Sequence, residues 1–326
     1  MPNKSVAVHG QSQPDSAPDE PLVLLRELFD TQPVMRGVPR AIGYMIALPH
    51  REQRVSTVWR KDFGNFAFVV EPGRLFLHGD GEGTPLAVPS GPRARLLLAY
   101  LIAWSFDNGN YEVDRSGISL NRWAESFDLS IGGKTYAAFQ DQELRLFSSH
   151  FITTFRDSGY EGAIWDQLCV NGMRPDPAQG AKLAHGKRNM VQLSTQLYGE
   201  IKAHPTRVPT HALSHLTNQS LGLDIYFWLA YRLPVMQDSE KISWDAIFEC
   251  FGTSYRNQYH FQPRFIEKLQ LALCAYPQAG VDIESDGLLL HPSPPPQDKS
   301  DRDKRALSRA TAARVSNNPA AVGHVV

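Results

Sequence analysis

The order of predicted helices and strands in residues 204–292 constrains the fold more than any other feature of the sequence. The first long element is an apolar helix over residues 221–233. Ser243 then caps a short helix over residues 244–251, and a longer helix follows over residues 262–276. Two short strand-like runs come last, separated by Asp286-Gly287, a pair typical of tight hairpin turns. This order is typical of a helix-turn-helix followed by a β wing.

A similar order occurs earlier in the chain. The sequence predicts a helix, a short extended piece, two further helices and two strand-like runs, over residues 92–106, 111–113, 120–127, 134–149, 150–155 and 163–170. The pair Gly132-Gly133 breaks the chain between the two later helices. Both halves therefore follow one pattern, and we predict an α+β fold with tandem winged-helix domains.

The other segments frame these two units. A short amphipathic helix is expected at residues 21–29, and strand signals run from Ile42 to about Val88. A strand at residues 191–194 leads into a connecting helix at 195–203, and a helix is expected at 210–216. The predicted organisation is a disordered N-terminus, a helical and β-rich extension, a first winged helix, a second winged helix, and a Pro-rich then basic disordered tail, over residues 1–20, 21–87, 88–203, 204–292 and 293–326.

The composition is that of a folded protein, but it identifies no partner. Hydrophobic residues make up 42% of the chain and charged residues 21%. The 33 lysines and arginines nearly balance the 34 aspartates and glutamates, so net charge does not favour a polyanionic partner. DNA binding therefore depends on where the charges lie.

The cysteines and the apolar runs indicate the compartment. The 3 cysteines are odd in number and widely spaced, which is typical of thiols in a reducing environment. No apolar run is long enough to span a membrane, and the N-terminus has no apolar signal-peptide core. We expect a cytoplasmic protein with no membrane partner.

Two motifs for nucleotide or metal chemistry are incomplete. The run Gly132-Gly-Lys-Thr135 has part of a phosphate-binding P-loop, but Asp128 stands where the loop needs a glycine. None of the 11 histidines forms the His-x-His pair of a rolling-circle nickase, and no nucleophile is spaced beside a base. We expect no enzyme activity, no cofactor and no metal.

Cationic and amide side chains gather in residues 254–268, where the last long helix begins. In a helix-turn-helix, the start of the second helix lies in the major groove, where arginine pairs with guanine and asparagine or glutamine with adenine. The predicted DNA-binding residues are Tyr255, Arg256, Asn257, Gln258, His260, Gln262, Arg264, Lys268, Lys241 and Lys134. The alternative to DNA binding is that these residues form only a solvated polar loop and helix face.

These residues have different expected roles. Arg256, Lys241 and Lys268 are expected to contact phosphates. Lys134 begins the corresponding helix of the first half and faces DNA backbone or solvent. The wing tip at residues 284–286 is acidic, so we expect it to repel phosphate and not to insert deeply.

Several segments, in their order and spacing, carry a resemblance to a known family. They are Ala47-Leu-Pro-His50, Ser90-Gly-Pro-Arg-Ala-Arg-Leu-Leu-Leu98, Gly132-Gly-Lys-Thr135, Leu221-Gly-Leu-Asp-Ile-Tyr-Phe-Trp-Leu-Ala-Tyr-Arg232, Ile242-Ser-Trp-Asp245 and Gly287-Leu-Leu-Leu-His-Pro292. With these segments the chain resembles the plasmid-encoded RepA-type replication initiators. The resemblance implies a homodimer that exchanges with monomers, binds repeated origin sequences (iterons), and recruits host replication initiation and helicase-loading proteins.

The helix after Gly133 departs from the family pattern. Relatives tend to carry several arginines there, whereas this chain has Tyr136, Gln140, Asp141 and Glu143. The first half is therefore expected to serve association, and the second half to read DNA. Two alternatives remain: a plasmid-borne transcriptional regulator that binds an operator palindrome with the same fold, and an interaction protein with no DNA role.

Overall fold

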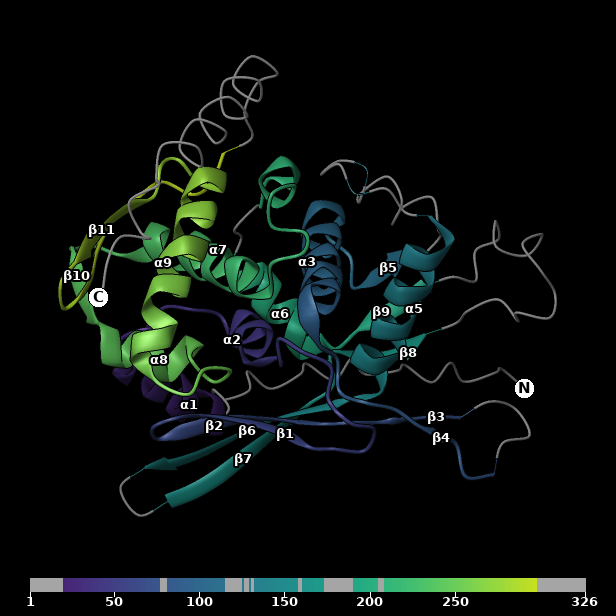
Figure 1. Cartoon of the computed structure of the whole chain (residues 1–326). Helices are drawn as coiled ribbons and strands as arrows, with labels where there is room; N and C mark the ends of the chain where they lie inside the picture. The colour runs from purple at the N-terminus through teal and green to yellow at the C-terminus, as the bar shows by residue number, and fades with distance from the viewer. Residues whose placement is uncertain are drawn as a thin grey trace, which may run out of the picture.

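The computed structural model describes residues 20–76, 81–114, 125, 129, 132–157, 160–172, 190–204 and 208–297. The predicted N-terminal disorder, the helix over residues 120–127 and most of the tail lie almost wholly outside these residues. Helices and antiparallel strands are mixed along the chain, so the predicted α+β class is confirmed (Figure 1). Among the described helices, none has both the length and the apolar composition that crossing a bilayer requires.

The second winged helix follows the predicted order closely. Its elements are α7 (Ser220–Arg232), β10 (Glu240–Ser243), α8 (Trp244–Phe251), α9 (Gln258–Ala275), β11 (Gly280–Glu284) and β12 (Gly287–His291). The strands form an antiparallel sheet in the order β10-β12-β11, so the last strand lies in the middle. The hairpin turn lies at Asp286-Gly287, as the sequence predicts.

The first winged helix has the same strand topology. Its described elements are α3 (Gly91–Asn108), β5 (Glu112–Asp114), α5 (Gly133–Ser148), β8 (Cys169–Gly172) and β9 (Met190–Leu193), with the sheet order β5-β9-β8. The prediction that residues 150–170 form its wing is wrong. The run at residues 163–170 belongs to two strands, and the strand predicted before the connecting helix is the central strand of this sheet.

The hairpin at residues 150–166 instead completes a separate sheet. Strands β6 (His150–Asp157) and β7 (Tyr160–Asp166) extend the hairpin of β1 (Trp59–Phe63) and β2 (Phe66–Glu71), in the order β1-β2-β6-β7. Figure 1 shows this sheet beneath the helices, with α1 (Glu20–Thr31) lying against it. The sequence could not predict this sheet, because β2 and β6 pair with each other although about half of the first winged helix lies between them in the sequence.

The structure corrects the prediction that strands begin at Ile42. The segment Arg40–Ala47 forms helix α2, and all of its residues are buried. Tyr44 of this helix packs on Phe68 and Phe151 of the sheet below, with ring centroids 5.0 and 5.2 Å apart. A short apolar run buried on all sides has no periodicity that distinguishes helix from strand.

Short elements connect these units. They are β3 (Arg74–Leu75), β4 (Thr84–Pro85), α6 (Thr195–Ala203) and the 3-10 turns η3 (Thr210–Leu213) and η4 (Leu233–Val235). Helix α6 has the predicted bounds, and Ser194 Oγ caps it by accepting from Leu197 N at 3.1 Å. The helix predicted at residues 210–216 is only the single 3-10 turn η3.

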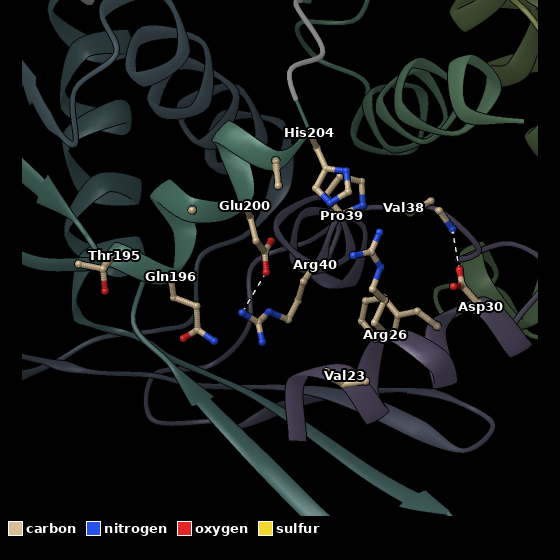
Figure 2. A pocket seen from close by; sticks show the side chains of 14 residues that line it. Val23, Arg26, Asp30, Val38, Pro39, Arg40, Thr195, Gln196, Glu200 and His204 are labelled. Carbon is tan, nitrogen blue, oxygen red and sulfur yellow. Dashed lines mark hydrogen bonds and ion pairs between the residues drawn. The ribbon is translucent and has the colours of Figure 1, made fainter. Parts of the chain in front are cut away.

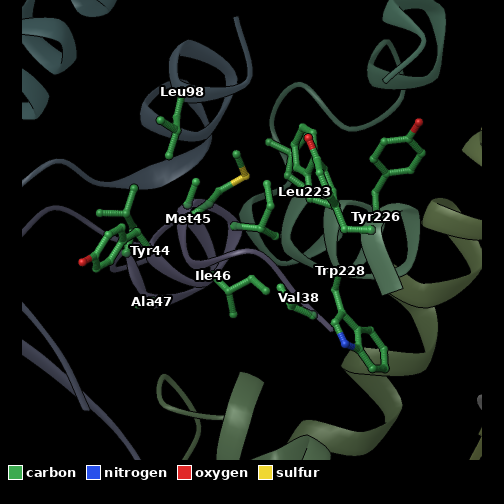
Figure 3. Close-up of a cluster of buried hydrophobic side chains, with 14 of the residues drawn as sticks. Val38, Tyr44, Met45, Ile46, Ala47, Leu98, Leu223, Tyr226 and Trp228 are labelled. Atoms are coloured by element: carbon green, nitrogen blue, oxygen red, sulfur yellow. The ribbon is translucent and has the colours of Figure 1, made fainter. Parts of the chain in front are cut away.

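Helix α7 lies at the centre of one continuous core. Every residue from Leu221 to Arg232 is buried, because α2, α3 and α9 pack around the helix. Figure 3 shows side chains of α2, α3 and α7 meeting in this core, among them Met45, Leu98 and Leu223. A helix that is apolar on all sides requires such surroundings, so the sequence indicated this burial correctly.

One buried ion pair joins the first helices of the two winged helices. Arg95 of α3 and Asp224 of α7 are both 0% exposed, and two bonds link them: Nε to Oδ1 at 2.6 Å and Nη2 to Oδ2 at 3.0 Å. The guanidinium also donates to the carbonyl oxygens of Leu48 and Gly91, at 2.7 and 3.0 Å. His50 Nε2 lies 2.8 Å from Asp224 Oδ2.

The pKa directions of this network follow from its surroundings. Burial alone raises the pKa of Asp224, but Arg95 and His50 outweigh burial and hold that pKa below its ordinary value. Burial lowers the pKa of His50 by more than the hydrogen bond to Asp224 raises it. Asp224 is therefore an anion at neutral pH, and Arg95 supplies its counter-charge.

The wing approaches β10 closely at Gly287. A Cβ at this position would lie 2.1 Å from the carbonyl oxygen of Ile242. Gly287→Ala is therefore expected to separate β12 from β10 and to lower the free energy of unfolding by about 1–3 kcal/mol. Urea unfolding measures the loss. Gly81→Ala, whose Cβ would meet open space, is the control, and an equal loss in both variants would contradict this interpretation of the contact.

Candidate nucleic-acid interface

The helix-turn-helix is built on α8, whose bounds the sequence predicted. Ser243 is the N-cap, and its Oγ accepts from Ala246 N at 3.3 Å. Asp245 lies in the first turn, where the helix dipole favours a negative charge. The buried side of α8 presents Trp244 and Phe251 to α9, with ring centroids 6.0 and 5.5 Å from Phe265. This packing fixes α9 on α8.

Helix α9 begins four residues earlier than the sequence predicted. Asn257 is its N-cap, and its Oδ1 accepts from His260 N at 3.1 Å. The predicted reading residues Gln258 and His260 therefore lie in the first turn of the helix instead of in a loop before it. Pro263 lies inside the helix, where its missing N–H leaves out one main-chain hydrogen bond. The cap uses one acceptor position of the Asn257 amide oxygen and leaves the amide nitrogen free to donate to a base.

The two sides of α9 differ in character. The buried side carries apolar residues at helical spacing: Phe261, Phe265, Leu269, Ala272 and Ala275. The opposite side is exposed and carries Tyr259, His260 and Arg264. An amphipathic second helix with its polar side free is what docking in a major groove requires.

The structure brings most of the predicted residues together at the start of α9. Arg256, Asn257, His260 and Arg264 are exposed, whereas Gln258, Gln262 and Lys268 are half-buried. Tyr255 is also half-buried, with its ring centroid 5.4 Å from that of Phe261. Because it packs on Phe261, Tyr255 mainly stabilises the turn before α9.

Glu267 forms ion pairs with two of the cationic side chains of α9. Its Oε2 lies 3.1 Å from Arg264 Nη1, and its Oε1 lies 2.8 Å from Lys268 Nζ. The hydrogen bonds from Lys268 and Arg264 lower the pKa of Glu267. Two cations therefore share one carboxylate. Arg256, by contrast, forms no ion pair with any residue that the structure describes.

Lys241 is held by the wing. Its Nζ lies 2.6 Å from Glu284 Oε2 and 2.8 Å from Asp286 Oδ1. Hydrogen bonds to Asp286 and Glu284 raise the pKa of Lys241, and that from Lys241 lowers the pKa of Asp286. This pairing reduces the repulsive charge of the wing tip. A phosphate contact by Lys241 stays a prediction, and it would require the ammonium to leave these carboxylates.

Lys134 lies apart from this group. It is exposed at the start of α5 in the first winged helix. In Figure 1, α5 and α9 lie on opposite sides of α3. The only basic residue in the last turn of α5, Arg145, is paired with Asp141 at 3.0 Å and with Glu52 at 2.7 Å. The described part of α5 therefore presents little free positive charge.

The sequence reasoning missed two residues of this surface. Tyr259 is 78% exposed in the first turn of α9, with its ring centroid 5.3 Å from that of His260. Arg51 is exposed, and its charge lowers the pKa of Tyr255, which burial raises and which Arg264 lowers more strongly. Tyr259 stands within the segment already singled out. Arg51 comes from the extension about 200 residues earlier, and only the fold places it here.

Comparisons with known proteins bear on the fold alone. No family model matches the sequence. No curated protein matches it either. The structure is similar to a crystal structure of domains 2 and 3 of RctB, with a TM-score of 0.50 and 10% identity over 77% of this chain and 96% of that chain. Another crystal structure of RctB domains 2-3 gives a TM-score of 0.47 and 9% identity, over 76% and 94% of the two chains. The first similarity covers most of this chain and shows a shared fold.

Proposed function

We propose that this chain is a replication initiator that binds double-stranded DNA through α9 and catalyses no reaction. The supporting observation is the exposed surface at the start of α9: His260 and Arg264 stand on the second helix of a helix-turn-helix, and Arg256 lies in the turn directly before it. The apolar side of the same helix is fully used in the core. The fold is also that of domains 2 and 3 of RctB, a replication initiator.

The charges assign different tasks to the side chains. Arg256 has no ion-pair partner among the described residues, so its guanidinium is free for guanine or phosphate. Arg264 points from the exposed side but shares Glu267 with Lys268. When Arg264 moves to a base, Lys268 keeps Glu267 neutralised, so the carboxylate does not repel the DNA. Arg51 adds a cation beside the turn and suits a phosphate of the flanking backbone.

The finer parts of the proposal rest on the family resemblance. We propose that the sites are repeated origin sequences, that the chain exchanges between dimer and monomer in the cytoplasm, and that host replication initiation and helicase-loading proteins are recruited. A chain that reads one half-site per α9 suits short repeats, because each copy supplies one recognition helix.

An electrophoretic mobility shift with the DNA that flanks the gene tests DNA reading. Wild-type protein is expected to give specific retardation that weakens as salt is raised. The double variant R256A/R264A is expected to lose at least about thirtyfold in specific affinity, since each good base contact contributes about 1–3 kcal/mol. Cooperative urea unfolding of the variant checks that the fold is intact.

A charge-matched control separates base reading from general attraction. Arg60 and Arg156 are exposed arginines of the four-stranded sheet, 53% and 78% exposed. R60A/R156A removes the same charge and is expected to keep specific retardation. Equal losses in the two double variants would remove the assignment of α9 as the reader.

A transformation assay distinguishes an initiator from a regulator of the same fold. A plasmid whose only origin is the flanking DNA is expected to be maintained when the wild-type gene is supplied, and to be lost with R256A/R264A. Specific binding to a single palindrome without plasmid maintenance would favour the transcriptional regulator instead.

A further inference from the structure

A pocket of about 580 Å³ lies between α1, the turn before α2, and α6 (Figure 2). Its volume is within the range of small-molecule sites. Most of its wall is apolar and includes Val23, Phe29, Val38, Pro39 and Ala203. Because α6 connects the two winged helices, the pocket lies where the N-terminal extension meets this connection.

The acidic groups of the pocket are already engaged. Asp30 Oδ1 accepts from Gly37 N at 3.1 Å. Glu200 Oε2 accepts from Ala41 N at 2.9 Å, and its Oε1 lies 2.9 Å from Arg40 Nη2. Arg40 also lies 3.3 Å from Asp166 Oδ2. These contacts hold the pocket wall together, and they pair the Glu200 carboxylate with Arg40.

Two basic side chains of the pocket are in a different situation. Arg26 of α1 and His204, which follows α6, line the pocket from opposite walls. Neither forms a hydrogen bond or an ion pair with any side chain that the structure describes. They are close enough that burial, and then the charge of Arg26, lower the pKa of His204. An arginine and a histidine that face one apolar space suit an anion, whose charge in turn favours the protonated form of His204.

We propose that this pocket binds a carboxylic acid with an apolar body, whose carboxylate lies between Arg26 and His204. The apolar body fills the space lined by the aliphatic and aromatic residues of the wall, and the carboxylate accepts charge-assisted hydrogen bonds from the two basic side chains. A ligand in this position contacts both α1 and α6, so it stabilises the contact of the extension with the connection between the winged helices. This site is separate from α9, and the proposal does not depend on DNA binding.

Isothermal titration of the full chain with octanoate, and with octanamide as a neutral match, tests the charge requirement. Octanoate is expected to bind saturably at one site, and octanamide about tenfold more weakly, because the amide cannot form the charge-assisted bonds. R26Q and H204Q are each expected to weaken octanoate about tenfold and to leave octanamide unchanged. K202Q removes an exposed charge from α6 outside the pocket and is expected to have no effect.

A pocket-filling variant locates the binding. Gly199 lines the pocket, and a Cβ built there has no heavy atom within 4 Å, so the backbone at this position accepts the leucine of G199L. It is expected to abolish octanoate binding while the thermal unfolding temperature is kept or raised, because leucine favours the helix more than glycine does. The proposal is overturned if octanoate shows no saturable binding at millimolar concentration, if octanamide binds equally well, or if G199L binds octanoate like the wild type.

Discussion

Arg95→Leu is expected to lower the free energy of unfolding by about 3–5 kcal/mol, because it leaves Asp224 buried without its counter-charge. Asp224 is 0% exposed, so water cannot replace the two bonds that the guanidinium makes. The carbonyl oxygens of Leu48 and Gly91 lose their donor at the same time. His50 is then the described side chain that remains hydrogen-bonded to the carboxylate. Urea unfolding followed by circular dichroism measures the loss.

The double variant R95L/D224L is the matched control. Replacing both partners of a buried pair by apolar residues removes the unpaired charge, so the double variant is expected to recover a large part of the loss. The size of the recovery shows how much of the lost stability comes from the unpaired charge and how much from the changed shape of the side chain. A double variant as unstable as R95L would show that the guanidinium acts through packing, and a loss of less than about 1 kcal/mol in R95L would contradict the role of the pair.

Trp228→Ala is expected to cost about 3–5 kcal/mol, the usual loss for removing a large buried aromatic side chain. The Trp228 indole is 0% exposed, and its ring centroid lies 5.4 Å from that of Phe251 in α8. Its Nε1 donates to the carbonyl oxygen of Val34 at 2.7 Å. The side chain thus ties the turn after α1 to α7 and α8. Truncation leaves a cavity and an unpaired carbonyl together.

Trp165→Ala is the matched control for this prediction. Trp165 lies on β7 and is 70% exposed, so its removal is expected to change stability by less than about 0.5 kcal/mol. Thermal unfolding of both variants gives the comparison. Trp228→Phe keeps the ring contact but not the donor, and an intermediate loss is expected. A Trp228→Ala variant as stable as Trp165→Ala would mean that the core closes over the cavity.

Local signals predicted the second winged helix well. Ser243 and the Asp286-Gly287 turn act over a few residues, so the bounds of α8 and of the hairpin followed from the sequence. The α2 segment and the four-stranded sheet did not, because burial on all sides removes periodicity and because β2 pairs with a strand about 85 residues later. Because this long-range pairing is not visible in the sequence, the β6–β7 hairpin of the four-stranded sheet was predicted to be the wing of the first winged helix.

The candidate interface was predictable in part for similar reasons. Residue type and helix order identified the 254–268 segment, and the structure gathers most of it on one exposed surface. Ion pairing was not predictable, because whether Lys241 meets Asp286 depends on strand register. Arg51 was not predicted as part of this surface, because its proximity to Tyr255 depends on the whole fold. Sequence patterns thus identify a surface, and the geometry decides which of its charges are free.

The shared core around α7 fixes the two winged helices as one piece. Chains whose DNA-binding units are joined by a flexible linker adapt to different spacings between contacts. Here a buried salt bridge and a common hydrophobic centre hold α5 and α9 at one separation and one angle. A surface on one half can therefore meet a long duplex only at a set phase from the surface on the other.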